Sequence, residues 1–138
     1  YTTLFRSPDA QLFCASVEEE LAFGPLQMGL AEDEVRRRVE DAIRYFSLEK
    51  LREKPPYFLS GGEKKRTALA SIFTMNPAVW TLDEPENFLD AESQEWLTGF
   101  LQALKEAGKT IIVTSHHPDI AGKVADREIR LTAEHQLG

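Results

Sequence analysis

Apolar residues recur at two different spacings along this chain, and the spacing changes after residue 57. Within residues 32–46 the apolar positions follow the helical repeat and predict an amphipathic helix; they are Val35, Val39, Ala42, Ile43 and Phe46. Two short apolar runs, 78–82 and 110–114, lie on either side of a second amphipathic helix, predicted over 90–107. Such runs are typical of strands covered on both faces, and their order predicts a parallel sheet with a right-handed crossover.

Shorter signals predict the remaining elements. The segment Ser16-Val17-Glu18-Glu19 has the pattern of a capping box that opens a helix, and Gly24-Pro25 is expected to end that helix. Pro55-Pro56 is a rigid break before the next helix. The other expected elements are a strand over 1–5, a loop at 7–9, helices over 17–23, 60–75 and 119–124, and a strand over 127–131.

These elements predict an α/β protein in which part of a parallel sheet layer is combined with an α-helical subdomain. Residues 1–57 are expected to hold one strand and the helical subdomain, and residues 58–138 the α/β layer. A length of 138 residues fits one domain.

Composition narrows the choice of partners. The net charge is −7, and no extended run of Lys and Arg occurs, which argues against nucleic acid as a partner. The basic clusters 36–38 and 64–66 are therefore expected to be solvated helix faces. No run of about 18 apolar residues occurs, so association with a membrane would require a partner protein. Cys14, the only cysteine, fits a reducing compartment and is expected to be a small buried apolar residue.

The segment Ser60-Gly61-Gly62-Glu63 opens the helix predicted over 60–75. Ser60 can cap the helix and Glu63 can complete a capping box, so a purely structural role is sufficient. Two glycines in the first turn, however, weaken a helix by about 1 kcal/mol each relative to alanine. They also leave bare N–H groups that a phosphate can approach closely, which makes this segment a candidate phosphate site.

Three candidate catalytic side chains follow the two predicted strands. Asp83 and Glu84 come after the first strand and His116 comes after the second. Because the carboxyl ends of parallel strands meet at one edge of a sheet, we expect these side chains to converge. Asp83 is suited to hold Mg²⁺, Glu84 to activate a water, and His116 to contact a γ-phosphate. The alternative is that the acids are solvated charges at a strand end and the histidine is structural.

Four segments in this order resemble the ATP-binding-cassette (ABC) ATPases. They are Leu59–Glu63, which is similar to the signature motif, Ala78–Pro85, similar to the Walker B segment, Glu86–Asp90, similar to the D-loop, and Thr114–His116, similar to the switch-histidine loop. Residues 8–13 and 17–25 closely resemble the energy-coupling-factor type, whose ATPases drive uptake of vitamins and of cobalt or nickel ions.

The resemblance implies a P-loop NTPase fold, ATP and Mg²⁺ as ligands, and ATP hydrolysis coupled to import. It implies a head-to-tail dimer with a second ABC ATPase subunit, in which each signature helix closes over the ATP of the other subunit. It also implies an integral membrane component, which would hold the dimer at the cytoplasmic face of the membrane. The residues expected to contact ATP through the signature motif are Ser60, Gly61, Gly62 and Glu63.

The sequence departs from the family pattern at three places. No segment of the form G-x-x-x-x-G-K-[ST] occurs, and we therefore expect the chain to be the C-terminal part of such an ATPase domain. Arg6 stands at the position of the Q-loop glutamine; a guanidinium is only a donor, so it can contact phosphate but cannot ligate a metal. Phe88 occupies a D-loop position where small residues are usual, and Asp90 suits a helix N-cap as well as a dimer contact.

Two alternatives stay open. One is a soluble ABC ATPase of DNA repair or translation, although the helical segment 17–56 has no coiled-coil insertion of the DNA-repair type. The other is a degenerate subunit that does not hydrolyse ATP and lends only its signature motif, and Arg6 is the reason to consider it.

We predict that the chain by itself hydrolyses no ATP, because its sequence lacks the loop that would hold the β- and γ-phosphates. The measurement is magnesium-dependent release of phosphate from ATP. Turnover above that of a Glu84→Gln variant would contradict this prediction.

Overall fold

Three parallel strands lie at the centre of the structure, a computed structural model that describes residues 2–5 and 7–131. The strand order is β1-β2-β3, and both pairs are parallel. The elements in chain order are β1 (Thr2–Phe5), α1 (Pro8–Gln11), α2 (Val17–Gln27), α3 (Glu32–Tyr45), two 3-10 turns (Glu49–Leu51 and Pro56–Phe58), α4 (Gly61–Met75), β2 (Val79–Asp83), α5 (Ala91–Glu106), β3 (Thr110–Thr114) and α6 (Pro118–Val124).

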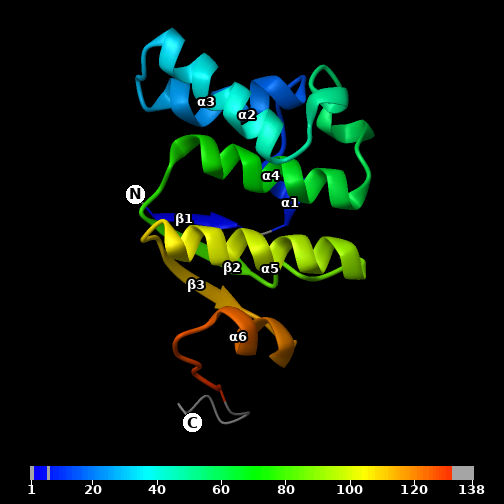
Figure 1. Cartoon of the computed structure of the whole chain (residues 1–138). Coiled ribbons are helices and arrows are strands. Elements are labelled where there is room, and N and C mark those ends of the chain that lie inside the picture. Colours follow the sequence, from blue (N-terminus) through cyan, green and yellow to red (C-terminus); the bar gives the residue numbers. More distant parts are fainter. Residues whose placement is uncertain (1, 6, 132–138) are drawn as a thin grey trace.

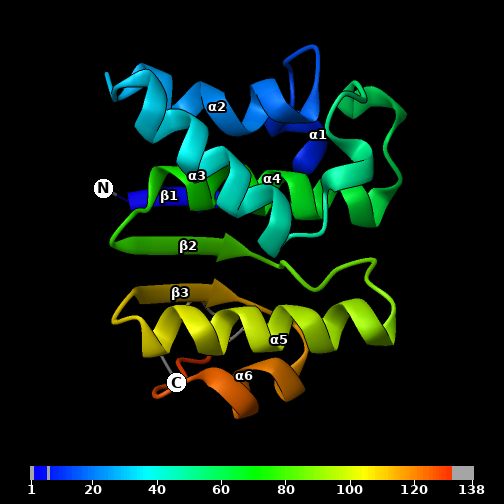
Figure 2. The same cartoon turned by 45° about the horizontal axis from the view of Figure 1, so that its top comes forward.

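The helices form layers around this sheet. Helix α4 lies between the sheet and the pair α2 and α3, whereas α5 and α6 lie on the side of β3 (Figure 1 and Figure 2). The predicted combination of a small parallel sheet with a helical part is thus confirmed. The division of the chain at residue 57 stays a prediction. None of the helices in the described part of the chain is long and apolar enough to cross a bilayer.

A group of aromatic rings joins the helical part to the α/β layer. The Phe46 ring, at the end of α3, lies 5.5 Å from the Phe73 ring of α4 and 5.4 Å from the Phe100 ring of α5. Phe100 also contacts Trp80 of β2 and Trp96 of α5, each at 5.5 Å between ring centroids. Edge-to-face and stacked pairs of this kind bury large apolar areas, and they tie α3, α4, α5 and β2 into one core.

Helix α2 does not end at Gly24-Pro25, as the sequence predicted, but continues to Gln27. A proline inside a helix removes the N–H that would bond to the carbonyl four residues earlier, here that of Leu21. The Thr74 hydroxyl of α4 donates to that buried carbonyl at 2.8 Å and so replaces the missing bond. The prediction was wrong because the compensating group comes from a distant helix.

Three other expectations also need correction. The loop at 7–9 is partly the short helix α1, because Pro8 fits the first helical position. Strand β3 is not covered on both faces: Ile111 and Val113 pack against the core, whereas Ile112 points the other way and is 54% exposed. Residues 127–131 form no strand, and only Leu131 makes an isolated bridge.

We predict that Thr74→Val lowers the free energy of unfolding by about 1–3 kcal/mol, because the Leu21 carbonyl stays buried and loses its donor. The measurement is urea unfolding of the chain. The Thr74 hydroxyl also lies 2.8 Å from the Ser71 carbonyl of its own helix. The matched control is Thr98→Val on α5, where the hydroxyl donates to the Gln94 carbonyl of its own helix and lies at the surface. We expect the control to change stability by less than about 0.5 kcal/mol. Equal losses in the two variants would contradict the role assigned to Thr74.

Candidate functional site

The start of α4 and the carboxyl end of β2 face one pocket of about 400 Å³. Gly61 and Lys64 line it from α4, and Asp83 and Glu84 line it from the end of β2. Asn87, in the turn that follows β2, contributes a further part of the wall. The two motifs that the sequence singled out separately are therefore neighbours in this chain.

The predicted capping box at the start of α4 is present. The Ser60 hydroxyl accepts from the Glu63 N–H at 3.3 Å, and the Glu63 carboxylate accepts from the Ser60 N–H at 2.8 Å. A side chain added at Gly61 or Gly62 would meet nothing within 4 Å. The N–H groups of these glycines have no acceptor within the described part of the chain, so an anion can approach them directly.

Asp83 is the last residue of β2 and is paired in register with Thr114 of β3. The Thr114 hydroxyl donates to Asp83 Oδ1 at 2.6 Å, which orients an exposed carboxylate at the rim of the pocket. Residues 2–5 and 7–131 contain no cluster of three or more His, Cys, Asp or Glu that could hold a metal ion by itself. A single oriented carboxylate fits Mg²⁺ that is coordinated mainly by substrate oxygens and water.

Glu84 begins the turn after β2 and has a left-handed backbone, with φ at 45°. Its N–H donates to the Thr114 carbonyl at 3.0 Å, so the chain turns while still attached to β3. His116 Nε2 lies 2.6 Å from Glu84 Oε1, and the Asn87 side-chain amide donates to Glu84 Oε2. The expected convergence of Glu84 with His116 is thus present, and their catalytic roles stay predictions.

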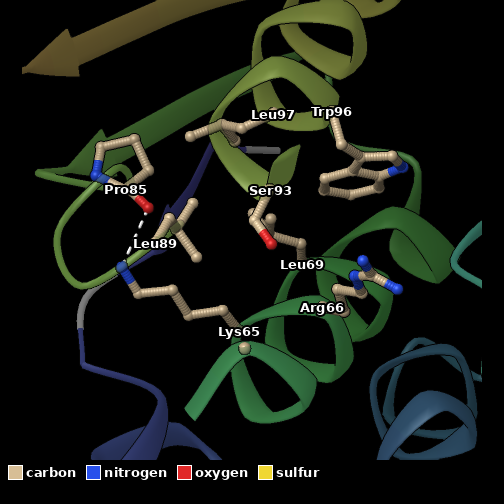
Figure 3. A pocket seen from close by; sticks show the side chains of 9 residues that line it. Lys65, Arg66, Leu69, Pro85, Leu89, Ser93, Trp96 and Leu97 are labelled. Carbon is tan, nitrogen blue, oxygen red and sulfur yellow. Dashed lines mark hydrogen bonds between the residues drawn. The ribbon is translucent and has the colours of Figure 1, made fainter. Parts of the chain in front are cut away.

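The turn after β2 is held from two sides. The Lys65 ammonium of α4 donates to the Pro85 carbonyl at 3.0 Å, as Figure 3 shows, and also to the Asn87 carbonyl. Glu86 is buried, and its Oε1 accepts from the hydroxyl of Ser115, which precedes His116. Burial lowers the pKa of Lys65, and the Glu86 charge acts in the opposite direction.

The basic cluster 64–66 is not a solvated helix face, as the sequence predicted. Lys65 is half-buried, and the Arg66 guanidinium lies 5.7 Å from the Trp96 ring centroid in a cation–π contact. Figure 3 shows both side chains beside a small gap of about 10 Å³ next to Leu89. Lys64 forms an ion pair with Asp9 at 2.8 Å.

Asp90 and Arg6 are the remaining predicted site residues. Asp90 is the N-cap of α5, and its Oδ1 accepts from the Ser93 N–H at 2.8 Å. The N-cap interpretation is therefore confirmed, and a dimer contact stays a prediction. Arg6 lies outside the described residues, and its role at the Q-loop position also stays a prediction.

Sequence reasoning missed Lys65, Asn87 and Thr114. Thr114 could have been found by aligning the two predicted strands, because the parallel register places it beside Asp83. Lys65 carried no such signal, because a lysine in a basic cluster is most often a surface residue.

We predict that Asp90→Asn alters how stability depends on pH. The bond from Ser93 lowers the pKa of Asp90 below its ordinary value of 3.8, so this carboxylate stabilises the fold above that pH. The contribution is lost as the pH falls through the lowered pKa, and asparagine, which also caps helices, has no such dependence. Urea unfolding at pH 7 and near pH 2 should show a difference between the two proteins that shrinks in acid. A difference that does not change with pH would contradict the assignment.

Comparisons with known proteins identify the family of this chain. The ABC transporter family profile matches residues 5–87. The energy-coupling factor transporter ATP-binding protein EcfA of Methanoculleus marisnigri is 44% identical over 124 residues, which are 89% of this chain and 45% of that protein. The nickel import ATP-binding protein LarO of Lactiplantibacillus plantarum is 45% identical over 134 residues, which are 97% of this chain and 56% of that protein.

A solved structure shows the same fold. CbiO1 of Clostridium perfringens, described as part of the ABC transporter complex cbiONQ, superposes with a TM-score of 0.76 at 42% identity. The superposition covers 86% of this chain and 48% of that one, and the chain likewise spans about half the length of the curated relatives it matches. Its fold is accordingly that of the ABC ATPases, a P-loop NTPase fold, and the chain belongs to the ABC transporter family.

Proposed function

We propose that this chain is part of the ATP-hydrolysing subunit of an importer of the energy-coupling-factor type. The observation that carries the proposal is the arrangement at the strand ends. Asp83 and Glu84 line one pocket together with Gly61 of α4, and His116 pairs with Glu84. Relatives named for energy-coupling-factor transport and nickel import support the transport role. They favour it over a soluble ATPase of DNA repair or translation.

Each residue has a chemical task in this proposal. Glu84 accepts a proton from the attacking water, since its carboxylate is oriented from both sides by His116 and Asn87. Asp83, oriented by Thr114, would hold Mg²⁺ together with phosphate oxygens. His116, with a side chain that is 84% exposed, would contact a γ-phosphate beside the Glu84 carboxylate. When bound, Mg²⁺ would neutralise charge on the β- and γ-phosphates.

The proposed partners follow from the family of the chain. Gly61 and Gly62 offer N–H groups to a phosphate, and the nearby Lys64 ammonium is paired with Asp9. We therefore propose that they close over nucleotide held by a second ABC ATPase subunit in a head-to-tail dimer. An integral membrane component would place this dimer at the cytoplasmic face of the membrane. The proposed cargo is a vitamin or a metal ion. Nickel is an example of such an ion, since one relative is named for nickel import.

We predict that Glu84→Gln lowers kcat for ATP by about 10²-fold or more, because glutamine cannot accept the proton. ATP-dependent dimers should persist, since the substitution keeps the shape and removes one negative charge beside the phosphates. The measurement is phosphate release by the complete subunit with its partners, together with its size by light scattering in the presence of ATP.

The matched control for this prediction is Glu92→Gln, an exposed residue in the first turn of α5. It makes the same chemical change outside the pocket and should leave kcat unchanged. Hydrolysis at the wild-type rate in Glu84→Gln would refute the assignment of Glu84 as the base.

A further inference from the structure

Asn87 contacts Glu84, the predicted base, through both its side chain and its backbone. Its side-chain amide donates to Glu84 Oε2, and its N–H donates to the Glu84 carbonyl at 3.2 Å. Glu84 Oε1 is engaged by His116, so Asn87 is what holds the second carboxylate oxygen. Without that donor, the contact with His116 alone would restrain rotation about the last torsion of Glu84, which is a soft one.

The backbone of Asn87 is in turn held by helix α4. The Lys65 ammonium donates to the Asn87 and Pro85 carbonyls, and Lys65 lies one helical turn after Gly61. The side chain is half-buried, so water competes less for the ammonium than it would at an open surface. A displacement of the first turn of α4 would therefore displace the turn that carries Asn87.

We propose that Asn87 is a positioning residue for Glu84 and that Lys65 makes this positioning depend on the first turn of α4. The inference rests on the proposed function, because it assigns Glu84 a water to activate. The proposed contacts connect the glycines of α4, which would contact one nucleotide, to Glu84, which would act on another. The connection runs through the side chains of Lys65 and Asn87 and through the turn after β2.

The first test is Asn87→Asp in the complete subunit with its partners. Aspartate keeps the size and the turn preference of asparagine, but its ionised carboxylate cannot donate and repels Glu84. We expect kcat to fall about tenfold or more while KM for ATP stays within about twofold, because only the transition-state interaction is lost. A kcat within twofold of wild type, or a fall in kcat matched by loss of ATP binding, would overturn the proposal.

The matched control is Asn76→Asp at the other end of α4. Asn76 also sits in a turn, with a left-handed φ of 51°, and its Oδ1 accepts from Lys109 at 2.7 Å. Aspartate can keep both features, so kcat should not change. An equal loss of kcat in this control would show that a carboxylate introduced beside α4 is damaging in general, and would overturn the specific role of Asn87.

The second test separates the link through Lys65 from simple charge balance. Lys65→Met keeps the buried aliphatic stem and removes both bonds to the turn. We expect kcat to fall severalfold and the double variant Lys65→Met/Asn87→Asp to be no slower than Asn87→Asp alone, because both act through one contact. Multiplying losses would overturn the link. So would full recovery in Lys65→Met/Glu86→Gln, which would mean that Lys65 serves only to neutralise Glu86.

The same measurements distinguish a failure of this inference from a failure of the proposed function on which it rests. Turnover that is equal in the wild type and in Glu84→Gln would overturn the proposed function, and this inference with it. Turnover that depends on Glu84 but is unchanged in Asn87→Asp would overturn this inference alone.

Discussion

The half-buried ammonium group of Lys65 is the contact on which the geometry of the site depends. Taking an ammonium partly out of water is unfavourable unless it finds other partners. Here the partners are two backbone carbonyls of the turn after β2, with the buried charge of Glu86 nearby. A turn that relaxed would lose these bonds, and a shift of α4 would move the turn. The bonds therefore favour one relative position of the helix and the strand end.

The turn itself is strained, and that strain is what separates the two acidic side chains. Glu84 and Phe88 have left-handed backbones, with φ at 45° and 62°, which costs a residue with a Cβ about 1 kcal/mol or more. The bonds from Glu84 to Thr114 and from Lys65 to the turn offset this cost. Asp83 still follows the strand and meets Thr114, whereas Glu84 leaves it and meets His116. Two neighbouring carboxylates are thereby given different surroundings.

Local signals predicted most of the elements because caps and helical periodicity act over a few residues. The capping box of α4 and the N-cap at Asp90 are of this kind, and both are present. What the sequence could not show are contacts between residues far apart in the chain. Pro25 stays helical because of Thr74, and Lys65 is half-buried because of a turn twenty residues later. The three consecutive apolar residues 111–113 predicted that β3 is buried on both faces. The sequence does not show that the face with Ile112 is not covered.

The contacts that join α3 to α4 and α5 differ in directionality from the contact that joins α4 to the turn after β2. The ring contacts of Phe46 with Phe73 and Phe100 are apolar, and apolar contact depends on area rather than direction, so a small sliding of the helix changes it little. The bonds of Lys65 are directional and weaken steeply when the donor moves. A small movement of the first turn of α4 therefore weakens the contacts with the turn after β2 more than the contacts in the core. The core sets which helix faces the pocket, and the polar contact sets where the Glu84 carboxylate lies within it.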